Sequence, residues 1–319
     1  MNSQTRQSLD LSLVIPFYNE QESLQELYNR IVDTIGDRNY EIIFIDDGSL
    51  DESARVVDDL VYQNPRVKLI QFQRNFGKAA ALAAGFRACQ GNIVVTMDAD
   101  LQDDPDEIPN LIEKLESGYD LVSGWKKIRH DPLSKRLASK VYNFFTSLMS
   151  GIWLHDFNCG LKAYRKEVIK TIQVYGDLHR YLPVLAHHSG FRVTELPVQH
   201  HPRQFGKSKF GAARFTRGAF DLITITFLTR YRKRPLHLFG LIGMISALMG
   251  TIVLLILTYQ RLVLNIYLSN RPILFLGVLL IIVGIQFFSM GLLGEMVTSH
   301  RESSDAYLIK RVNGIDIDF

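Results

Sequence analysis

Two carboxylates with one residue between them, Asp98 and Asp100, lie in the apolar segment formed by residues 92–102. In an extended backbone, side chains two positions apart point to the same side, so both carboxylates could reach one ligand. Carboxylate oxygens are typical ligands of Mg²⁺ and Mn²⁺, which also bind phosphate oxygens. The spacing therefore suggests a metal site for a phosphorylated substrate, although ordinary acidic loops share this spacing.

Other polar side chains follow two earlier apolar segments. Asn19 follows the first, while Asp46 and Asp47 follow the second and begin an Asp-Asp-Gly-Ser turn. These carboxylates could accept hydrogen bonds from a base or a ribose, but aspartate, glycine and serine are also common turn formers.

Basic side chains that could bind a diphosphate or a lipid phosphate come from three places in the chain. They are Lys78; then Lys126, Lys127, Arg129, Lys135 and Arg136; and then His200, His201, Arg203, Lys207 and Lys209. Such runs of charge also occur on ordinary solvated surfaces, so the charges alone leave both interpretations open.

Short apolar segments alternate with longer segments of helical periodicity through residues 11–123. The expected strands are residues 11–15, 42–45, 67–72, 92–102 and 119–123, and the expected helices are residues 22–35, 53–63, 78–89 and 108–116. This alternation predicts an α/β domain with a mostly parallel sheet covered by helices on both faces. Ligands bind such sheets beyond the carboxyl ends of the strands, where the polar residues above are expected.

Composition limits the classes of partner. The 319 residues contain 36 Lys+Arg and 33 Asp+Glu, a net charge of +3, so nucleic acid is not an expected partner. The spacing of Cys89 and Cys159 matches neither a zinc site nor a disulfide framework, which favours free thiols in a reducing compartment. Residues 1–10 are polar and lack the apolar core of a signal peptide, so the first domain is expected to stay in the cytoplasm.

Two segments, residues 235–260 and 272–294, contain no Asp, Glu, Lys or Arg. At 1.5 Å per residue each could cross about 30 Å of hydrocarbon, so two transmembrane helices are expected; buried helices of a soluble protein are the alternative. Glycines and serines in both segments would allow close helix packing and possible homo-oligomers. More basic residues flank the outer ends than lie in the connection, which places both termini in the cytoplasm.

Residues 207–234 mix phenylalanines with basic residues just before the first span. This pattern favours amphipathic helices lying in the membrane interface, with helices packed on the domain as the alternative. The predicted organisation is a cytoplasmic catalytic domain at residues 1–206, juxtamembrane helices at 207–234, two spans at 235–296 and a cytoplasmic tail at 297–319.

Three blocks at residues 15–20, 46–51 and 98–103 together resemble family 2 glycosyltransferases, which have the Rossmann-like GT-A fold. With two C-terminal spans, the chain is similar to polyprenyl-phosphate glycosyltransferases, among them bactoprenol glucosyltransferases of the GtrB type and dolichol-phosphate mannose synthases. The resemblance implies inverting, Mg²⁺- or Mn²⁺-dependent transfer of a sugar to polyprenyl (undecaprenyl) phosphate at the cytoplasmic face of the inner membrane. Glucose from UDP-glucose is the expected sugar, and modification of a cell-surface glycan is the expected purpose.

The resemblance also implies residue roles. The implied nucleotide-sugar residues are Pro16, Tyr18, Glu20, Asp47, Lys78, Asp98, Gln102, Arg203 and Lys209; the metal ligands are Asp98, Asp100 and Gln102; the acceptor-phosphate residues are Lys126, Lys135 and Ser139; and the catalytic residues are Asp100 and Asp156. Lysines stand at two acceptor positions where the family usually has arginines, so the bidentate geometry of a guanidinium is lost there.

Three alternatives remain open at this point. The donor could be GDP-mannose, since these motifs do not determine the sugar. A processive polysaccharide synthase is disfavoured, because neither Trp125 nor Trp153 belongs to the Gln-X-X-Arg-Trp block of those enzymes. A non-catalytic nucleotide-binding scaffold is disfavoured by the intact Asp98, Asp100 and Gln102.

Overall fold

The computed structural model describes most of the chain, and the remaining residues are not discussed structurally. The described residues are 9–127, 133–172, 178–202, 234–267 and 272–301, with isolated positions at 224, 227 and 231; side chains are not described at 133–138 and 298–301. The chain divides into two compact units, Met1–Ile225 and Thr226–Phe319. Each unit is described by itself.

A seven-stranded sheet forms the centre of the first unit, with strand order β3-β2-β1-β4-β6-β5-β7. The strands are β1 (Leu11–Phe17), β2 (Tyr40–Asp46), β3 (Val67–Gln71), β4 (Ile93–Thr96), β5 (Leu121–Lys126), β6 (Lys162–Arg165) and β7 (Val193–Val198). Only β6 runs antiparallel to its neighbours, β4 and β5, and the other paired strands are parallel. The predicted mostly parallel α/β sheet is therefore confirmed.

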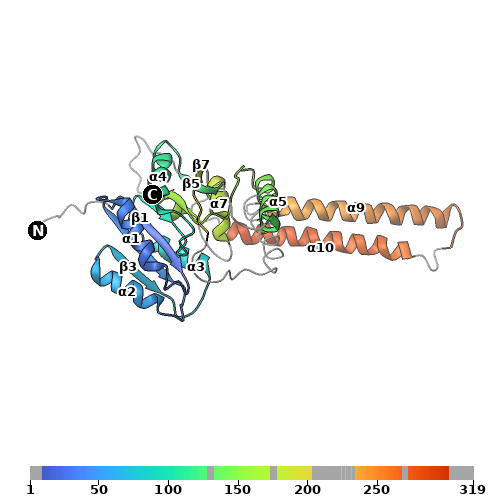
Figure 1. Ribbon diagram of the computed structural model, residues 1–319. Coiled ribbons are helices and arrows are strands. Elements are labelled where there is room, and N and C mark those ends of the chain that lie inside the picture. Colours follow the sequence, from blue (N-terminus) through green and yellow to red (C-terminus); the bar gives the residue numbers. More distant parts are fainter. Residues whose placement is uncertain are drawn as a thin grey trace, which may run out of the picture. The chain divides into compact units, whose positions relative to one another are not determined.

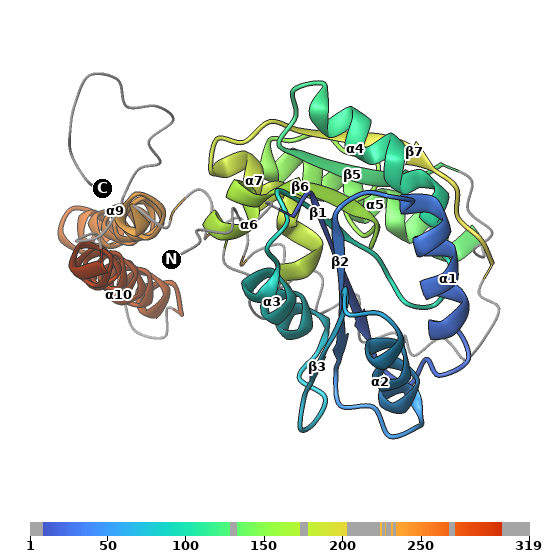
Figure 2. The ribbon, with the colours of Figure 1, turned by 90° about the vertical axis from the view of Figure 1, so that its left-hand side faces the viewer.

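Helices cover both faces of this sheet (Figure 2). They are α1 (Leu24–Ile35), α2 (Ser53–Gln63), α3 (Lys78–Ala88), η1 (Pro105–Glu107), α4 (Ile108–Glu116), α5 (Leu133–Ser150), α6 (Lys166–Thr171), η2 (Leu178–Tyr181) and α7 (Leu182–His188). The predicted bounds of α2 and α4 are confirmed, and those of α1 and α3 differ by two residues or fewer at either end.

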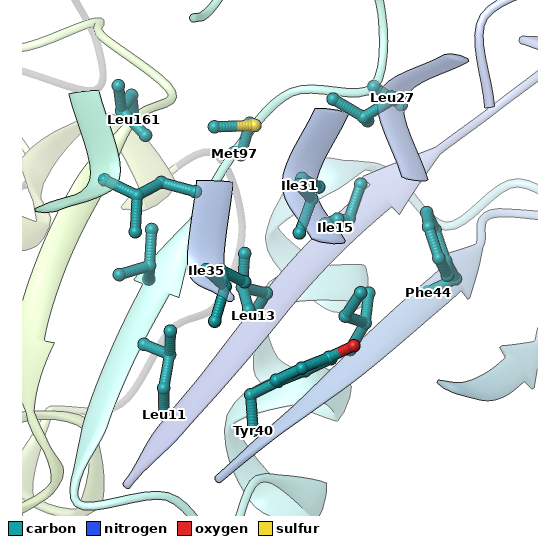
Figure 3. Packing of buried hydrophobic residues seen from close by; sticks show 14 of the residues in the cluster. Leu11, Leu13, Ile15, Leu27, Ile31, Ile35, Tyr40, Phe44, Met97 and Leu161 are labelled. Atoms are coloured by element: carbon teal, nitrogen blue, oxygen red, sulfur yellow. The ribbon is translucent and has the colours of Figure 1, made fainter. Parts of the chain in front are cut away.

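The central strand β1 is buried along its whole length, and its side chains alternate between two cores. Leu11, Leu13 and Ile15 belong to the core that includes α1, as Figure 3 shows. Val14 belongs to the core on the opposite face, together with Leu82 of α3. Because β1 is covered on both faces, its unbroken apolar sequence is the pattern expected of a parallel central strand.

The other predicted strands shift by up to three residues at an end, and the sheet differs most from the sequence prediction in two places. Strand β4 ends at Thr96, so the prediction that an extended strand continues to residue 102 is wrong. Strands β6 and β7 were not predicted. Because β6 is antiparallel, its first residue, Lys162, pairs with Thr96, the last residue of β4, and with Ser123 of β5. Lys162 therefore lies at the edge of the sheet where ligands are expected.

The second unit contains two long helices, α9 (Pro235–Leu262) and α10 (Pro272–Arg301), shown in Figure 1. Both are long and apolar enough to cross a membrane. They pack closely through glycines: a Cβ on Gly243 would lie 2.6 Å from the carbonyl oxygen of Gly284, and the hydroxyl of Ser246 donates to the carbonyl of Leu280 at 2.8 Å. Apart from its isolated described positions, the predicted juxtamembrane segment at residues 207–234 lies outside the described residues until Arg234.

Candidate functional site

The loop that follows β4 carries Asp98, Asp100 and Gln102. The Asp98 backbone N–H donates to Asp103 Oδ2 at 3.4 Å, and the Gln102 N–H donates to Asp100 Oδ1 at 3.3 Å. Between them, Leu101 is fully buried with a φ of 58°, an uncommon conformation for a residue with a side chain. The two carboxylates are therefore held by a tight turn at the sheet edge and not by an extended strand.

Asp98 is held from two sides. Lys78, the first residue of α3, forms an ion pair with its carboxylate. On another side Gly160 lies so close that a Cβ there would be 2.5 Å from Asp98 Cγ. Burial raises the pKa of Asp98, but the charges of Lys78 and Lys126 outweigh that effect and lower it to about 2. Asp98 is therefore an anion at neutral pH, with 32% of its side chain exposed.

Lys126, at the end of β5, lies beside the same loop. Its Nζ is 3.0 Å from Asp103 Oδ1, and the two side chains are 15% and 1% exposed. Burial lowers the pKa of Lys126, but the charge of Asp103 outweighs it and holds the pKa above its ordinary value. Lys126 therefore stays positively charged. Its ion pair with Asp103 attaches it to the loop that carries Asp98.

The segment after β7 fixes the far side of this loop. His200 forms an isolated antiparallel bridge with Asp103, and the His201 N–H donates to the Gln102 carbonyl at 2.9 Å. The ring Nε2 of His201 lies 2.8 Å from an oxygen of Asp104. Burial lowers the pKa of His200, which favours the neutral form of its imidazole. Two consecutive histidines, which follow the unpredicted strand β7, thus hold the loop in place.

Residues 156–162 form another side of the site, next to Asp98. Asp156 is buried and its Oδ1 accepts a hydrogen bond from the Asn158 N–H at 3.0 Å. Lys162 is 3% exposed, and its Nζ donates to the carbonyl of Cys159. Burial lowers the pKa of Lys162, with the positive charge of Lys78 acting in the same direction. A buried lysine is unusual unless anions balance its charge, and the carboxylates of Asp156 and Asp98 act in that direction here.

Backbone N–H groups after β1 donate to serine hydroxyls in the segment that runs from β2 into α2. The Asn19 N–H donates to Ser49 Oγ at 3.0 Å, and the Glu20 N–H donates to Ser53 Oγ at 2.8 Å. Asp47 accepts hydrogen bonds from the backbone N–H groups of Phe76, at 2.7 Å, and Gly77. Its carboxylate therefore holds the loop that leads into α3 and places Lys78. Burial raises the pKa of Asp47 despite these hydrogen bonds.

The predicted site residues fall into three groups. Those that the structure brings around the β4 loop are Lys78, Asp98, Asp100, Gln102 and Lys126, with Asp156 connected through the segment that carries Gly160. Those at the neighbouring strand ends are Pro16, Tyr18, Glu20 and Asp47. Ser139 lies on α5, whereas the side chain of Lys135, and Arg203 and Lys209 altogether, lie outside the described residues. The roles assigned to all of these residues stay predictions.

His179 is a site residue that sequence reasoning missed. It lies in η2, and among the described atoms its buried Nδ1 has no hydrogen-bond partner. Burial lowers the pKa of His179 to about 3, with the charges of Lys78 and Arg180 adding to the effect. No motif marks this histidine, since it comes from a short helix that reaches the site only through the tertiary fold.

The residues on this edge are compatible with a metal ion that is also bound by phosphate. Across the described ranges, no three His, Cys, Asp or Glu side chains form a group that could hold a metal by themselves. Asp98 and Asp100 offer carboxylate oxygens and Gln102 an amide oxygen, which suit Mg²⁺ or Mn²⁺ with phosphate oxygens completing the shell. The metal ligands stay a prediction.

Comparison with known proteins identifies the family. A family model described as glycosyl transferase family 2 matches residues 12–173, about half of the chain. The chain belongs to this family. It is a glycosyltransferase, and the resemblance seen in its three motif blocks is confirmed.

Curated family 2 relatives match nearly the whole chain. A dodecaprenyl-phosphate galacturonate synthase of Rhizobium johnstonii is 36% identical over 96% of this chain and 94% of its own length. An undecaprenyl-phosphate 4-deoxy-4-formamido-L-arabinose transferase of Edwardsiella ictaluri is 38% identical over 90% of this chain and 88% of its own.

Solved structures confirm the GT-A fold of this family 2 chain. The mannosyltransferase PcManGT from Pyrobaculum calidifontis, solved with GDP-Man and Mn²⁺, superposes with a TM-score of 0.51. The match covers 92% of this chain and 76% of that one at 18% sequence identity. At this identity the likeness concerns the fold alone.

Proposed function

We propose that this glycosyltransferase transfers a sugar from a nucleoside-diphosphate sugar to polyprenyl phosphate at a membrane surface. The observation that carries the proposal is the cluster of ionised Asp98 with Lys78 and Lys126 at the carboxyl edge of the sheet. This cluster occurs in a chain with two helices long and apolar enough to span a membrane. The curated relatives named above carry dodecaprenyl-phosphate and undecaprenyl-phosphate in their names, which supports the same acceptor class.

The donor half of the site would bind a diphosphate. Lys78 and Lys126 are cations beside the carboxylate loop, where they would neutralise the charge that grows on the leaving nucleoside diphosphate. Asp98, Asp100 and Gln102 would hold Mg²⁺ or Mn²⁺, which would supply further positive charge at the diphosphate. Pro16, Tyr18, Glu20 and Asp47 would border the nucleoside, and Arg203 and Lys209 would complete the diphosphate site.

The acceptor needs to be positioned more than deprotonated, because a phosphate monoester is already an anion at neutral pH. Asp156 is buried and accepts a hydrogen bond from Asn158, which supports an orienting role over that of a general base. Lys135 and Ser139 of α5 are proposed to bind the acceptor phosphate. Lys126 is shared, since its ion pair with Asp103 keeps it charged at the boundary between donor and acceptor. A single displacement on this site would invert the anomeric centre.

The sugar is the open part of the proposal. UDP-glucose is the donor expected from family likeness, but the relatives named above are a galacturonate synthase and a 4-deoxy-4-formamido-L-arabinose transferase. We therefore propose a UDP-sugar as donor and keep UDP-glucose as one member of a set to be tested.

The membrane part of the proposal follows the flanking charges. Helices α9 and α10 would span the inner membrane, with the catalytic domain and both termini in the cytoplasm. The proposed domain bounds are those expected from the sequence: residues 1–206, 207–234, 235–296 and 297–319.

A donor screen tests the proposed function. The full chain is reconstituted in vesicles that contain undecaprenyl phosphate and is given Mg²⁺ or Mn²⁺ with one donor at a time. The donors are UDP-glucose, UDP-galacturonate, UDP-4-deoxy-4-formamido-L-arabinose and GDP-mannose. Mass spectrometry of the extracted lipid should show one dominant glycosylated polyprenyl phosphate, and NMR of the product should show an inverted anomeric centre. A product from GDP-mannose alone would contradict the UDP-sugar, and a retained anomeric centre would contradict the single displacement.

A further inference from the structure

Helix α5 (Leu133–Ser150) is labelled in Figure 1. Among its described side chains, the apolar and polar faces are reversed relative to a helix of a soluble domain. Val141, Phe144, Phe145 and Leu148 repeat at the i, i+3, i+4, i+7 spacing of one helical face, and each is 49–56% exposed. In a helix of a soluble protein this is the spacing of the side that packs on the core. Here the large apolar side chains point outward.

The opposite face of α5 is polar and buried. Asn143, Thr146, Ser147 and Ser150 have the same i, i+3, i+4, i+7 spacing, and none is more than 6% exposed. Asn143 Nδ2 donates to the carbonyl of His155 at 2.6 Å, and the Ser147 hydroxyl donates to the carbonyl of Leu154 at 3.5 Å, so the buried face is bonded to the segment after the helix. The orientation of the helix is therefore set by hydrogen bonds, and no rotation could bury the apolar face without breaking them.

The apolar face continues into the segment after the helix. Trp153 is 67% exposed, and its ring lies 6.2 Å from that of Phe144 in an edge-to-face contact. Phe144 in turn contacts Phe145 at 5.7 Å. A cluster of exposed aromatic rings costs hydration free energy in water, and tryptophan is enriched where proteins meet the membrane interface.

The charges of this region also favour a lipid surface. Residues 132–155 contain Lys135, Arg136 and Lys140 but no Asp or Glu. A helix with aromatic residues on one side and only basic charges along it is the pattern of segments that lie in an anionic membrane interface. A binding face for another soluble protein would not require the absence of acidic residues over this length.

From these features we infer that the apolar face of α5, together with Trp153, docks into the interface of a lipid bilayer. The surface consists of Val141, Phe144, Phe145, Leu148 and Trp153. This contact is a third attachment to the membrane, additional to helices α9 and α10 and separate from the segment at residues 207–234. It goes beyond the proposed reaction, because it holds whichever sugar the enzyme transfers.

Tryptophan quenching tests this docking directly. The chain has two tryptophans, so Trp125→Phe leaves Trp153 as the only one. The full-length variant is reconstituted in phosphatidylcholine–phosphatidylglycerol vesicles whose phosphatidylcholine carries bromine on its acyl chains near the headgroup. Since interfacial helices insert about 5–10 Å, bromine should reduce the Trp153 emission by roughly twofold relative to unbrominated vesicles.

A matched reporter on the same domain provides the control. Tyr62 on α2 is 90% exposed, so the variant Trp125→Phe/Trp153→Phe/Tyr62→Trp carries one tryptophan in water with the same helices α9 and α10. Its emission should not change with brominated lipid. Equal emission changes for the two reporters would overturn the inference.

Two further variants separate docking from loss of structure. Phe144→Ser/Phe145→Ser, in the Trp125→Phe background, should remove most of the quenching, whereas Thr146→Val on the buried face should keep it. If Trp125→Phe does not fold, a nitroxide attached at Leu148→Cys serves instead, because Cys89 and Cys159 are buried; oxygen should then broaden its spectrum more than a water-soluble nickel chelate does.

Three results would contradict the lipid surface. A blue-shifted but unquenched Trp153 would mean that another protein segment or a second copy covers the face. An emission change that needs added polyprenyl phosphate would mean that the acceptor chain occupies it. Nitroxide accessibility equal to that of a label on α2 would mean that the face stays in water. None of these readouts depends on turnover, so they are distinguishable from a failure of the proposed reaction.

Discussion

In the sheet domain, leucine, isoleucine and valine fill two cores, whereas in the α9–α10 pair the same residue types lie on the outside. Leu13 and Ile42 are fully buried between sheet and helices, while Leu241, Leu255 and Phe275 are 56–75% exposed. Most of the buried positions of α9 are glycines instead, namely Gly240, Gly243 and Gly250, with Pro235 and Leu257 as the others. The first unit thus buries most of its apolar side chains, as a domain in water does. The second has the exterior expected of helices that cross hydrocarbon.

The two units also differ in their charged side chains, because the sheet domain buries several of them whereas the helix pair is almost free of charge. The sheet domain buries Asp103, Asp156 and Lys162 at one edge, and it balances them through ion pairs and hydrogen bonds. Burying so many ionisable groups costs free energy, and such clusters are typical of functional sites. Helix α5 combines both patterns, since it belongs to the sheet domain and carries an exposed apolar face. The contrast therefore separates what serves chemistry from what serves the membrane.

The largest expected effect separates these two functions. Replacing Asp100 by Ala removes a carboxylate from the β4 loop and should lower turnover by about 10²–10³-fold or more, because charge at the leaving diphosphate is no longer stabilised. Insertion into vesicles, measured by flotation, should not change. Asp58→Ala, which removes an exposed carboxylate on α2, is the matched control and should keep full turnover. Normal turnover of the Asp100 variant would show that this loop does not hold the metal.

A second variant tests whether the position of Asp98 matters as much as its charge. A Cβ at Gly160 would lie 2.5–2.6 Å from the Asp98 carboxylate, so Gly160→Ala must displace that group. We expect kcat to fall by roughly 10–100-fold, as for other small misplacements of a reacting group. At Gly151 a Cβ meets nothing within 4 Å, although its φ is 77°. Gly151→Ala should therefore cost stability by about 1–2 kcal/mol without a comparable loss of kcat.

The buried His179 predicts a pH dependence of stability in the sheet domain. Its pKa is about 3 in the folded protein against 6.5 for the ordinary side chain, so below pH 6.5 the unfolded chain binds a proton that the folded chain does not. Stability should therefore fall as the pH falls from about 6.5 towards about 3. At pH 5 the loss from this group is about 2 kcal/mol, since each pKa unit is worth about 1.4 kcal/mol.

His179→Asn keeps a polar side chain but removes the titration. Between pH 7 and pH 5, the melting temperature of the wild-type protein in detergent should fall by roughly 4–8 °C more than that of this variant. Equal shifts for the two proteins would mean that the imidazole is already protonated or hydrated in the fold. Circular dichroism during heating measures both.

Much of the fold could be predicted because its information is local. The spacing of apolar residues gave α2 and α4 with the observed bounds, and the apolar run Ile42–Ile45 lies within strand β2. The long uncharged segments likewise predicted α9 and α10. In each case one short window of sequence shows which residues face a common environment.

The parts that could not be predicted depend on distant contacts. Strand β6 has only four residues, Lys162–Arg165, and it exists because β4 and β5 leave room for an antiparallel strand between them. Lysine is rarely buried, so nothing local indicated that Lys162 would face the site. The turn at Leu101 and the hydrogen bonds from Phe76 and Gly77 to Asp47 likewise arise from loops that meet only in three dimensions.

The smallest effect concerns the glycines between α9 and α10. A Cβ at Gly243 would lie 2.6 Å from the carbonyl oxygen of Gly284 and 2.9 Å from the backbone nitrogen of Phe288, so Gly243→Ala must push the helices apart. The expected cost is roughly 1 kcal/mol, at the low end for overpacking, because two helices in lipid can separate slightly. At Gly240 the nearest atom is the end of the Leu236 side chain, at 3.2 Å, which can move. Gly240→Ala should therefore melt close to the wild-type temperature in detergent, and Gly243→Ala a few degrees below it.

Turnover per folded molecule should stay the same in both variants, because neither glycine lies at the carboxylate loop. A loss of turnover in Gly243→Ala without a lower melting temperature would show that packing of the helix pair affects the chemistry directly, and the two units would then be less separate in function than their opposite construction indicates.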